Sequence, residues 1–397
     1  MNMKRLLLSV ISLLLVVSLG AQNKGAKVVC GPYLQSVTET GFTVVWVTDI
    51  DAICWVETAP DDGTHFYNKD RQKFYDMRGL GQHVIGKIHK VRVDGLKPGE
   101  TCRYRLMNQG VQSFKGSSNV KYTKITATDV YRGKPYEVTT FKDSYDTLKF
   151  DIYNDIHGKD SILNVLMSAG RKDIDFAALN GDMTSNIESP EMIQTMYLAT
   201  TANKLEGTTP LFASRGNHEL RGKDAVKWFD YFETPTGYTY YSFKLGKFFF
   251  IVLDACEDKP DNAFEYSGTV ISEGYLKQQE AWLKSVIESE AFASSEVRLA
   301  FCHIPPETKG WFGNANVCKY FVPHLNKGGI DAMFSAHIHK WRYDEVGCGM
   351  SDADFPVICS PNACRTEVTA TSDKIIVEVF DADANKLQTL EINCNKL

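Results

Sequence analysis

Residues with metal-ligand chemistry recur in five short groups along this 397-residue sequence. Carboxylate oxygen, amide oxygen and imidazole nitrogen together form a ligand set that suits Zn, Mn or Fe. In chain order the groups are Asp155-Ile156-His157, Gly181-Asp182, Gly216-Asn217-His218-Glu219, His303 and His337-Ile338-His339. One such group alone is more typical of a turn or a buried hydrogen-bonded pair. Five in succession, holding five of the nine histidines of the chain, indicate a metal site.

The elements that must position these groups are short apolar runs, each of which is expected to be a strand. Helical segments lie between some of them, most clearly at 276–287, and this alternation favours a layered α/β domain. In open α/β sheets, sites form just beyond the carboxyl ends of the strands. All five groups follow such ends directly. The predicted strands are 148–153, 176–179, 211–214, 248–253, 297–302 and 331–334.

The preceding part of the chain has a different pattern. Residues 28–141 contain strand-like runs such as 42–47 and 102–106, separated by turn sequences such as Leu96-Lys97-Pro98-Gly99, with no convincing helix. Short strands with this turn chemistry predict a β-sandwich of the fibronectin or immunoglobulin kind. We therefore expect two domains, 24–146 and 147–397.

The first residues are typical of a secretory leader. Lys4-Arg5 is followed by the apolar run 6–19 and then by small residues, so we expect a signal peptide at 1–21. The run is shorter than the 20 or so residues that a transmembrane anchor needs. No Asn-x-Ser/Thr sequon occurs, which favours a bacterial source. The sequence thus predicts an exported protein, periplasmic or extracellular.

Composition excludes several classes of protein. With 43% hydrophobic and 23% charged residues the chain can bury a core, which excludes a disordered or collagen-like protein. The net charge is -5, without basic runs, so no nucleic-acid-binding surface is expected. The ten cysteines are scattered without a CxxC pair, and their connectivity stays open. The oligomeric state also stays open.

The order of the five groups resembles that of the calcineurin-like metallophosphoesterase superfamily. The preceding domain, with Cys30-Gly31-Pro32-Tyr33-Leu34 and then Val44-Val45-Trp46, resembles the N-terminal domain of purple acid phosphatases. The resemblance implies an αββα domain that holds two metal ions. It implies that Asp155, His157 and His339 bind the first ion and that Asn217, His303 and His337 bind the second. Asp182 would bridge the two ions, and His218 would be the acid beside the leaving group.

The chain departs from the purple acid phosphatases at two positions. Ser185 stands where those enzymes have a tyrosine ligand, and His157 stands where they have no histidine. Both changes disfavour Fe(III) and favour divalent ions, such as Mn, Zn or Fe(II). The acid optimum and the colour of those enzymes are therefore not expected here.

These residues predict an exported phosphoesterase in which hydroxide held by two metals attacks phosphorus in line. Protonated His218 would assist the leaving group, and we expect a monoesterase rather than a diesterase. Arg221 could contact the substrate phosphate, and Trp311 and Phe312 could line the substrate cleft or simply pack. A nucleotidase and a polyphosphate or phytate hydrolase stay open. The alternative is a surface-binding scaffold with a vestigial metal site.

Overall fold

The computed structural model describes residues 24–394, in two compact units. The first comprises the described residues up to Pro32, with Val44–Val93 and Thr101–Val138; the second comprises Tyr33–Thr43, Asp94–Glu100 and Thr139 onward. The predicted leader at 1–21 lies outside the described residues. Among the helices that the structure describes, none combines the length and apolar character needed to cross a membrane.

The first unit is built from strands. Its long central strands β2 and β5 pair antiparallel, and the remaining strands pair with one or the other. The strands are β1 (Val28–Gln35), which runs on into the second unit, β2 (Gly41–Pro60), β3 (Gln72–Tyr75), β4 (Gly86–Asp94), β5 (Thr101–Lys115), β6 (Asn119–Ala127) and β7 (Tyr136–Thr139). In its described residues the helical content is one 3-10 turn, η1 (Phe66–Asn68). A sandwich arrangement of these strands stays a prediction.

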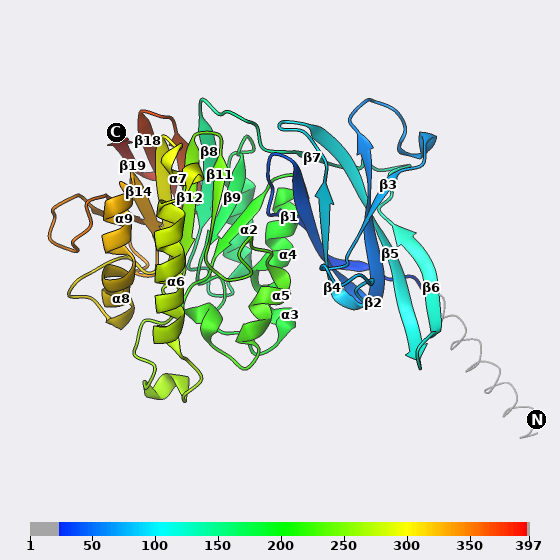
Figure 1. Cartoon of the computed structure of the whole chain (residues 1–397), viewed down its shortest axis with the longest axis horizontal. Helices are drawn as coiled ribbons and strands as arrows, with labels where there is room; N and C mark the ends of the chain where they lie inside the picture. Colours follow the sequence, from blue (N-terminus) through cyan, green and yellow to red (C-terminus); the bar gives the residue numbers. More distant parts are fainter. Residues whose placement is uncertain (1–23, 395–397) are drawn as a thin grey trace, which may run out of the picture. The chain divides into compact units, whose positions relative to one another are not determined.

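The second unit is mixed α/β and contains two six-stranded sheets, shown in Figure 1. The first has the order β10-β9-β8-β17-β18-β19, and the second β11-β12-β13-β14-β16-β15. The strands of the first are β8 (Leu148–Tyr153), β9 (Phe176–Asn180), β10 (Leu211–Ser214), β17 (Arg365–Ala370), β18 (Lys374–Phe380) and β19 (Lys386–Asn393). Those of the second are β11 (Tyr241–Leu245), β12 (Phe248–Leu253), β13 (Val297–Cys302), β14 (Ala332–Ser335), β15 (Arg342–Asp344) and β16 (Val357–Cys359).

Phenylalanine rings form the core between these two sheets. Phe150 of β8 meets Phe250 of β12 and Phe334 of β14 edge to face, with ring centroids 5.7 Å apart in both pairs. Phe176 of β9 meets Phe250 in the same way at 5.4 Å. Edge-to-face pairs at these separations add to the free energy gained from burial. The sheets therefore pack face to face, and the remaining face of each is available to helices.

Helices lie on both outer faces. Buried side chains of α6, α8 and α9, such as Leu276, Val317 and Leu325, share one apolar cluster with Ile251 of β12 and Ala300 of β13. On the first sheet, the end of α2 lies against the outward-facing Asp151 and Tyr153 of β8. The helices are α2 (Asp160–Ala169), α3 (Pro190–Ile193), α4 (Ala199–Leu205), α5 (Trp228–Tyr231), α6 (Ser272–Ile287), α7 (Glu290–Ala293), α8 (Phe312–Tyr320) and α9 (Val322–Gly328). This is the layered architecture expected from the alternation of strands and helices.

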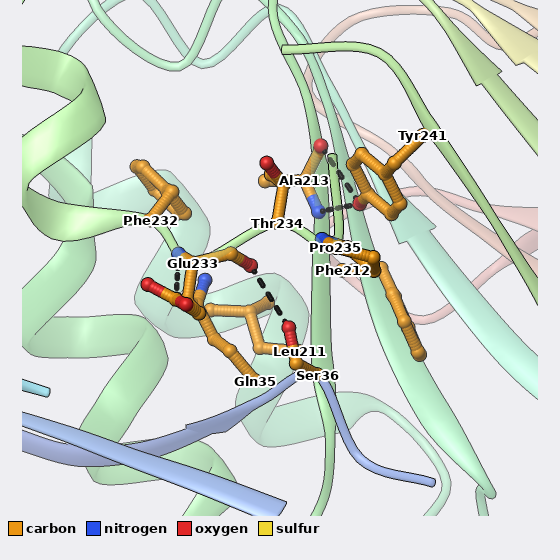
Figure 2. Close-up of a pocket in the computed structure, with 10 residues that line it drawn as sticks. All are labelled: Gln35, Ser36, Leu211, Phe212, Ala213, Phe232, Glu233, Thr234, Pro235 and Tyr241. Carbon is orange, nitrogen blue, oxygen red and sulfur yellow. Dashed lines mark hydrogen bonds between the residues drawn. The ribbon is translucent and has the colours of Figure 1, made fainter. Parts of the chain in front are cut away.

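The segment 33–43 is part of the second unit because its polar groups are paired there. Figure 2 shows Glu233 donating its N–H to Gln35 Oε1 at 2.6 Å and accepting a hydrogen bond from Ser36 Oγ through its carbonyl oxygen. Leu34 also bridges to Pro210 in the parallel sense. The cavity at this place measures about 10 Å³. Since a single water needs about that volume, this is a packing feature and not a ligand site.

Strand direction places the five polar groups together. β8, β9 and β10 run parallel in one sheet, and β12, β13 and β14 run parallel in the other. Backbone hydrogen bonds continue past the strand ends: Asp155 N–H donates to the Gly181 carbonyl at 3.1 Å, and His157 N–H donates to the Asp182 carbonyl at 3.0 Å. The loops that carry the polar groups are thereby fixed to one another.

Candidate metal centre

The structure gathers six of the seven predicted ligands, together with His218, into three overlapping groups that could hold metal ions. They are Asp155, His157 and His339; His157, Asp182 and His218; and Asp182, His303 and His337. Within each group the ligand atoms lie within 4.8 Å of one another. His157 and Asp182 each belong to two groups. One continuous array of donors therefore spans the ends of both sheets.

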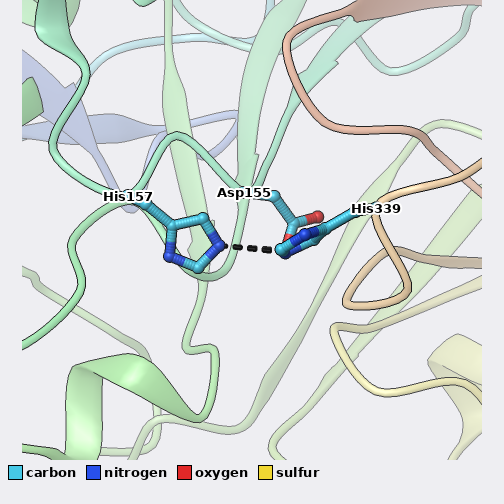
Figure 3. Close-up of side chains that lie close together, drawn as sticks. All are labelled: Asp155, His157 and His339. Carbon is cyan, nitrogen blue, oxygen red and sulfur yellow. Dashed lines mark hydrogen bonds and ion pairs between the residues drawn. The ribbon is translucent and has the colours of Figure 1, made fainter.

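Two carboxylates organise this array. Asp155 Oδ1 lies 3.3 Å from His339 Nε2 and 3.8 Å from His157 Nε2, and Asp182 Oδ2 lies 3.1 Å from His303 Nε2. Figure 3 shows that the rings of His157 and His339 direct their Nε2 atoms at each other, 3.0 Å apart, beside Asp155. Nitrogen atoms that converge in this way share one small volume, which a cation can occupy.

The backbone at these residues adopts an uncommon conformation. Asp155 and His157 have φ of 50°, Asp182 has 54°, His337 has 67° and His339 has 58°. Non-glycine residues adopt this left-handed region infrequently, at a cost of order 1 kcal/mol or more each. Five of the seven predicted metal ligands share it. The sharp turns after the strands aim these side chains inward, and the surrounding fold must supply the stabilisation that offsets their strain.

Several buried polar atoms of the site have no hydrogen-bond partner within the described chain. They are Asp155 Oδ1, His303 Nε2 and both side-chain atoms of Asn217. A buried acceptor without a partner is destabilising by about 1–3 kcal/mol. A metal ion would use the lone pairs of the carboxylate, the imidazole and the amide oxygen at once. The residues present therefore fit a metal centre. Asn217, which is in none of the three groups of Asp and His residues, could add an amide oxygen as a further metal ligand.

The carboxylates also make the site attractive to positive charge. Burial lowers the pKa of His303, but the neighbouring Asp182 and Asp155 outweigh burial and raise it to about 10. In the converse direction, burial raises the pKa of Asp182, but His303 and His218 hold it well below its usual range. The same negative charge would attract a metal cation.

His218 lies beside this array with both ring nitrogens engaged. Its Nδ1 is 2.8 Å from the carbonyl oxygen of Ser185, so Nδ1 carries a proton and donates it. Its Nε2 is 3.0 Å from Nη1 of Arg221, which can only donate, so Nε2 accepts. Nε2 also lies 3.9 Å from Asp182 Oδ2. The backbone carbonyl of Ser185 thus orients the His218 ring.

Arg221 is held in place by acidic partners. Nε and Nη2 each donate to one carboxylate oxygen of Glu257 at 2.9 Å, and Nη2 also reaches Asp258 Oδ1 at 3.3 Å. This two-pronged pairing fixes the plane of the guanidinium group. Arg221 therefore supports His218, and its pairing leaves little donor capacity for the substrate contact suggested by the sequence.

Glu219 has a function that the sequence pattern did not reveal. Its side chain is buried and accepts four backbone hydrogen bonds, from the N–H groups of Asp182, Met183, Thr184 and Gly216, at 2.8–3.1 Å. These N–H groups belong to the two loops that carry Asp182 and Asn217. One carboxylate thus joins two ligand loops. The sequence feature that could have pointed to this role is the position of Glu219 at the end of the Gly-Asn-His-Glu group.

Glu219→Gln is expected to lower the free energy of unfolding by about 2–5 kcal/mol, because the amide NH₂ would face backbone N–H groups and leave them unpaired. Bound metal should fall as well, since the Asp182 loop loses its anchor. Chemical denaturation and metal analysis measure the two effects. Glu188→Gln is the matched control, because Glu188 is exposed and its carboxylate accepts a hydrogen bond from the Asn186 side chain instead of from backbone N–H groups of the ligand loops. Unchanged stability and metal content in Glu219→Gln would refute this role.

A cavity of about 450 Å³ opens beside the metal-ligand array. Asp182, His218, His337 and His339 line it on the side of the array. Trp311 also lines the cavity, with 63% of its surface exposed and its ring centroid 6.1 Å from that of His337. Pockets of a few hundred Å³ suit small-molecule ligands. Of the two aromatic residues proposed for the cleft, Trp311 lines it and Phe312 does not.

Comparison with known proteins agrees with this geometry. Residues 148–341 match the family of calcineurin-like phosphoesterases, from the first residue of β8 to just beyond His339. They form a calcineurin-like phosphoesterase domain. The chain is 21% identical over 292 residues to purple acid phosphatase 15 of Arabidopsis thaliana, with 68% of this chain and 52% of that protein covered. The chain thus spans about half the length of that relative.

A solved structure of PhoD has a similar fold. It superimposes with a TM-score of 0.57 at 11% identity, covering 91% of this chain and 92% of that one. Together with the family match, this confirms the resemblance to metallophosphoesterases that the five polar groups indicated. The family match and the His and Asp clusters together indicate a site for divalent metal ions.

Proposed function

We propose that the protein hydrolyses phosphate esters at a centre of two divalent metal ions. The observation that carries this proposal is the position of Asp182, which groups with His303 and His337 on one side and with His157 on the other, while His157 itself groups with Asp155 and His339. A single ion would not require seven donors that extend across the ends of two sheets. Two ions that share a carboxylate would use all of them.

The proposed ligands comprise two of the three groups, with Asn217 added. Asp155, His157 and His339 would hold the first ion, Asn217, His303 and His337 would hold the second, and Asp182 would contribute to both. Such a pair supplies Lewis acidity, which neutralises phosphoryl oxygens and makes water acidic enough to attack in line at neutral pH. Two carboxylates partly balance the charge, so the centre stays attractive to an anionic ester.

The chain itself contributes orientation and proton transfer. Asn217 has an unpaired Nδ2 that can donate to a phosphoryl oxygen. His218 faces the cavity beside Asp182, where a leaving group would depart. Once protonated at Nε2, the ring would no longer accept the hydrogen bond from Arg221. It would donate a hydrogen bond to the departing oxygen instead. Ser185 would hold the ring orientation throughout by accepting from Nδ1.

We further propose that the enzyme is exported to the periplasm or the extracellular space and prefers monoesters to diesters. Export rests on the leader-like residues 1–21. The alternative, a binding scaffold with a vestigial site, is disfavoured because every ligand position and His218 are filled. Degenerate sites are expected to lack some of these residues.

A substrate panel tests the proposal. Mature protein loaded with Mn, Zn or Fe(II) is assayed with nitrophenyl phosphate, bis-nitrophenyl phosphate and nucleotides. We expect hydrolysis of the monoester, slower hydrolysis of the diester, and about two metal ions per chain by metal analysis. Metal-loaded protein that cleaves no ester would favour the scaffold.

A further inference from the structure

The cavity beside the metal-ligand array is lined by an exposed tryptophan, Trp311. Tryptophan side chains are on average highly buried, yet Trp311 exposes 63% of its surface where it lines the cavity. An indole face presented to a cavity offers a broad, weakly hydrated surface. Flat rings stack favourably on such a surface, whatever their exact identity.

The backbone that carries this ring is fixed. Trp311 N–H donates to Asn314 Oδ1 at 3.0 Å, and the Asn314 amide donates to the Pro305 carbonyl at 2.8 Å. Gly313 lies so close to Glu257, Asp258 and Ile304 that a Cβ atom there would approach within 3.0 Å of them. The chain at the start of α8 is therefore tied to the loop that follows His303. The backbone at Trp311 is thereby positioned with respect to the metal ligands, while most of the surface of the residue stays exposed.

The charged groups around the cavity are mainly acidic. Asp258 and Glu307 line it, and none of the described lining residues is Lys or Arg. Each of the nearest arginines is shared by two carboxylates: Arg221 by Glu257 and Asp258, and Arg342 by Glu307 and Asp344. Around Asp258, Lys259 adds one positive charge and Glu265 adds one negative charge. Each cluster therefore keeps an excess of one negative charge.

Two lysines adjoin lining residues in the chain without lining the cavity themselves. They are Lys309 and Lys340, and both are exposed. A leaving group with phosphates of its own would meet Asp258 and Glu307, whose clusters each keep one excess negative charge. A neutral leaving group meets no such repulsion.

From this geometry we infer the substrate class: a phosphate monoester whose leaving group is uncharged and bears a flat ring that stacks on Trp311, as in a nucleoside monophosphate or an aryl phosphate. This inference rests on the proposed function, because the metal centre must hold the phosphoryl group. It disfavours polyphosphates, phytate and nucleoside diphosphates as substrates.

Four esters separate the contributions of ring and charge. Adenosine 5′-monophosphate has a ring and a neutral leaving group, adenosine 5′-diphosphate adds charge to the same ring, and glycerol 3-phosphate has neither ring nor extra charge. Phenyl phosphate distinguishes an aryl from a nucleoside preference. We expect kcat/KM for adenosine 5′-monophosphate to exceed that for glycerol 3-phosphate by about 10-fold, within the range that ring stacking supplies. The ratio of kcat/KM for adenosine 5′-monophosphate to kcat/KM for the diphosphate should decrease as salt is added. Salt screens the repulsion between the additional phosphate and the acidic side chains.

Variants then assign these effects to residues. Trp311→Ala should remove the preference for ring-bearing esters, mainly through KM, and change kcat/KM for glycerol 3-phosphate by less than about 2-fold. Trp311→Phe should retain most of the preference, and Glu307→Gln should narrow the gap between mono- and diphosphate. Phe264→Ala is the matched control, since Phe264 is a 93% exposed aromatic residue that does not line the cavity.

Calorimetric titration with adenosine, which has no phosphate, supplies a readout independent of catalysis. Adenosine should bind the unmodified protein and Phe264→Ala, but not Trp311→Ala. The inference is wrong if Trp311→Ala lowers kcat/KM for all esters equally, or if the diphosphate is preferred. If no ester is cleaved but adenosine binding depends on Trp311, the proposed function fails while the ring site stands.

Discussion

Substitution of Asp182 by asparagine is expected to lower kcat by more than about 100-fold, since loss of mere supporting contacts to metal ligands already costs 10–100-fold in affinity or activity. Asp182 belongs to two ligand groups, and its carboxylate lies 3.1 Å from the buried His303 ring. Asparagine keeps the shape but removes the negative charge that both proposed ions share. Bound metal should fall below two per chain.

His339→Gln is the matched comparison for Asp182→Asn. His339 belongs to one ligand group, and its side chain is 45% exposed, so its loss should cost less than that of Asp182. Exhaustive chelation of the unmodified protein should abolish hydrolysis, and added Mn, Zn or Fe(II) should restore it. Full activity after chelation, or in Asp182→Asn, would contradict a shared metal centre.

His218→Ala is expected to slow esters of poorly acidic alcohols by about 10²–10⁴-fold, the usual contribution of a general acid. Nitrophenyl phosphate should be much less affected, because nitrophenolate departs without a proton. The plot of log kcat against leaving-group pKa should therefore become steeper. Metal content should stay near that of the unmodified protein, because His218 is not a ligand in this proposal.

His324→Ala provides the control for this experiment. His324 is a partly buried histidine of α9 whose Nε2 lies 3.2 Å from Glu280, and it does not line the substrate cavity. Its replacement should leave the dependence on the leaving group unchanged. An equal loss in His218→Ala for all leaving groups would instead assign His218 to orientation or charge stabilisation, together with its neighbour Arg221.

Local sequence predicted most of the residues that the structure gathers at the candidate metal centre. The polar groups follow apolar runs, and β8, β12 and β13 form over the predicted ranges, since hydrophobic patterning is a local signal. Parallel strands end at the same edge of a sheet, so side chains far apart in sequence could be expected to meet. The types of the predicted ligand residues alone favoured divalent transition-metal ions.

Other features depended on contacts between distant segments and had no local signal. Tyr33–Thr43 belongs to the second unit although the sequence pattern groups it with the strands before residue 147. The four N–H groups bound by Glu219 come from two loops more than thirty residues apart. How the loops pack decides this pairing. The sequence cannot show it, because every residue except proline has the same backbone N–H group.

Side-chain roles at the edge of the site were also decided by tertiary structure. An arginine next to Asn-His-Glu suggested a contact with substrate phosphate, but Glu257 and Asp258 arrive from another loop and hold its guanidinium group. Trp311 was equally compatible with packing or with a cleft until α8 and its partners fixed it in the cavity wall. The sequence by itself was enough to predict the metal ligands, because each is marked by its residue type at the end of a strand. The neighbours that orient those ligands and shape the cavity were decided only by the tertiary structure, because burial and pairing depend on segments that meet only when the chain folds.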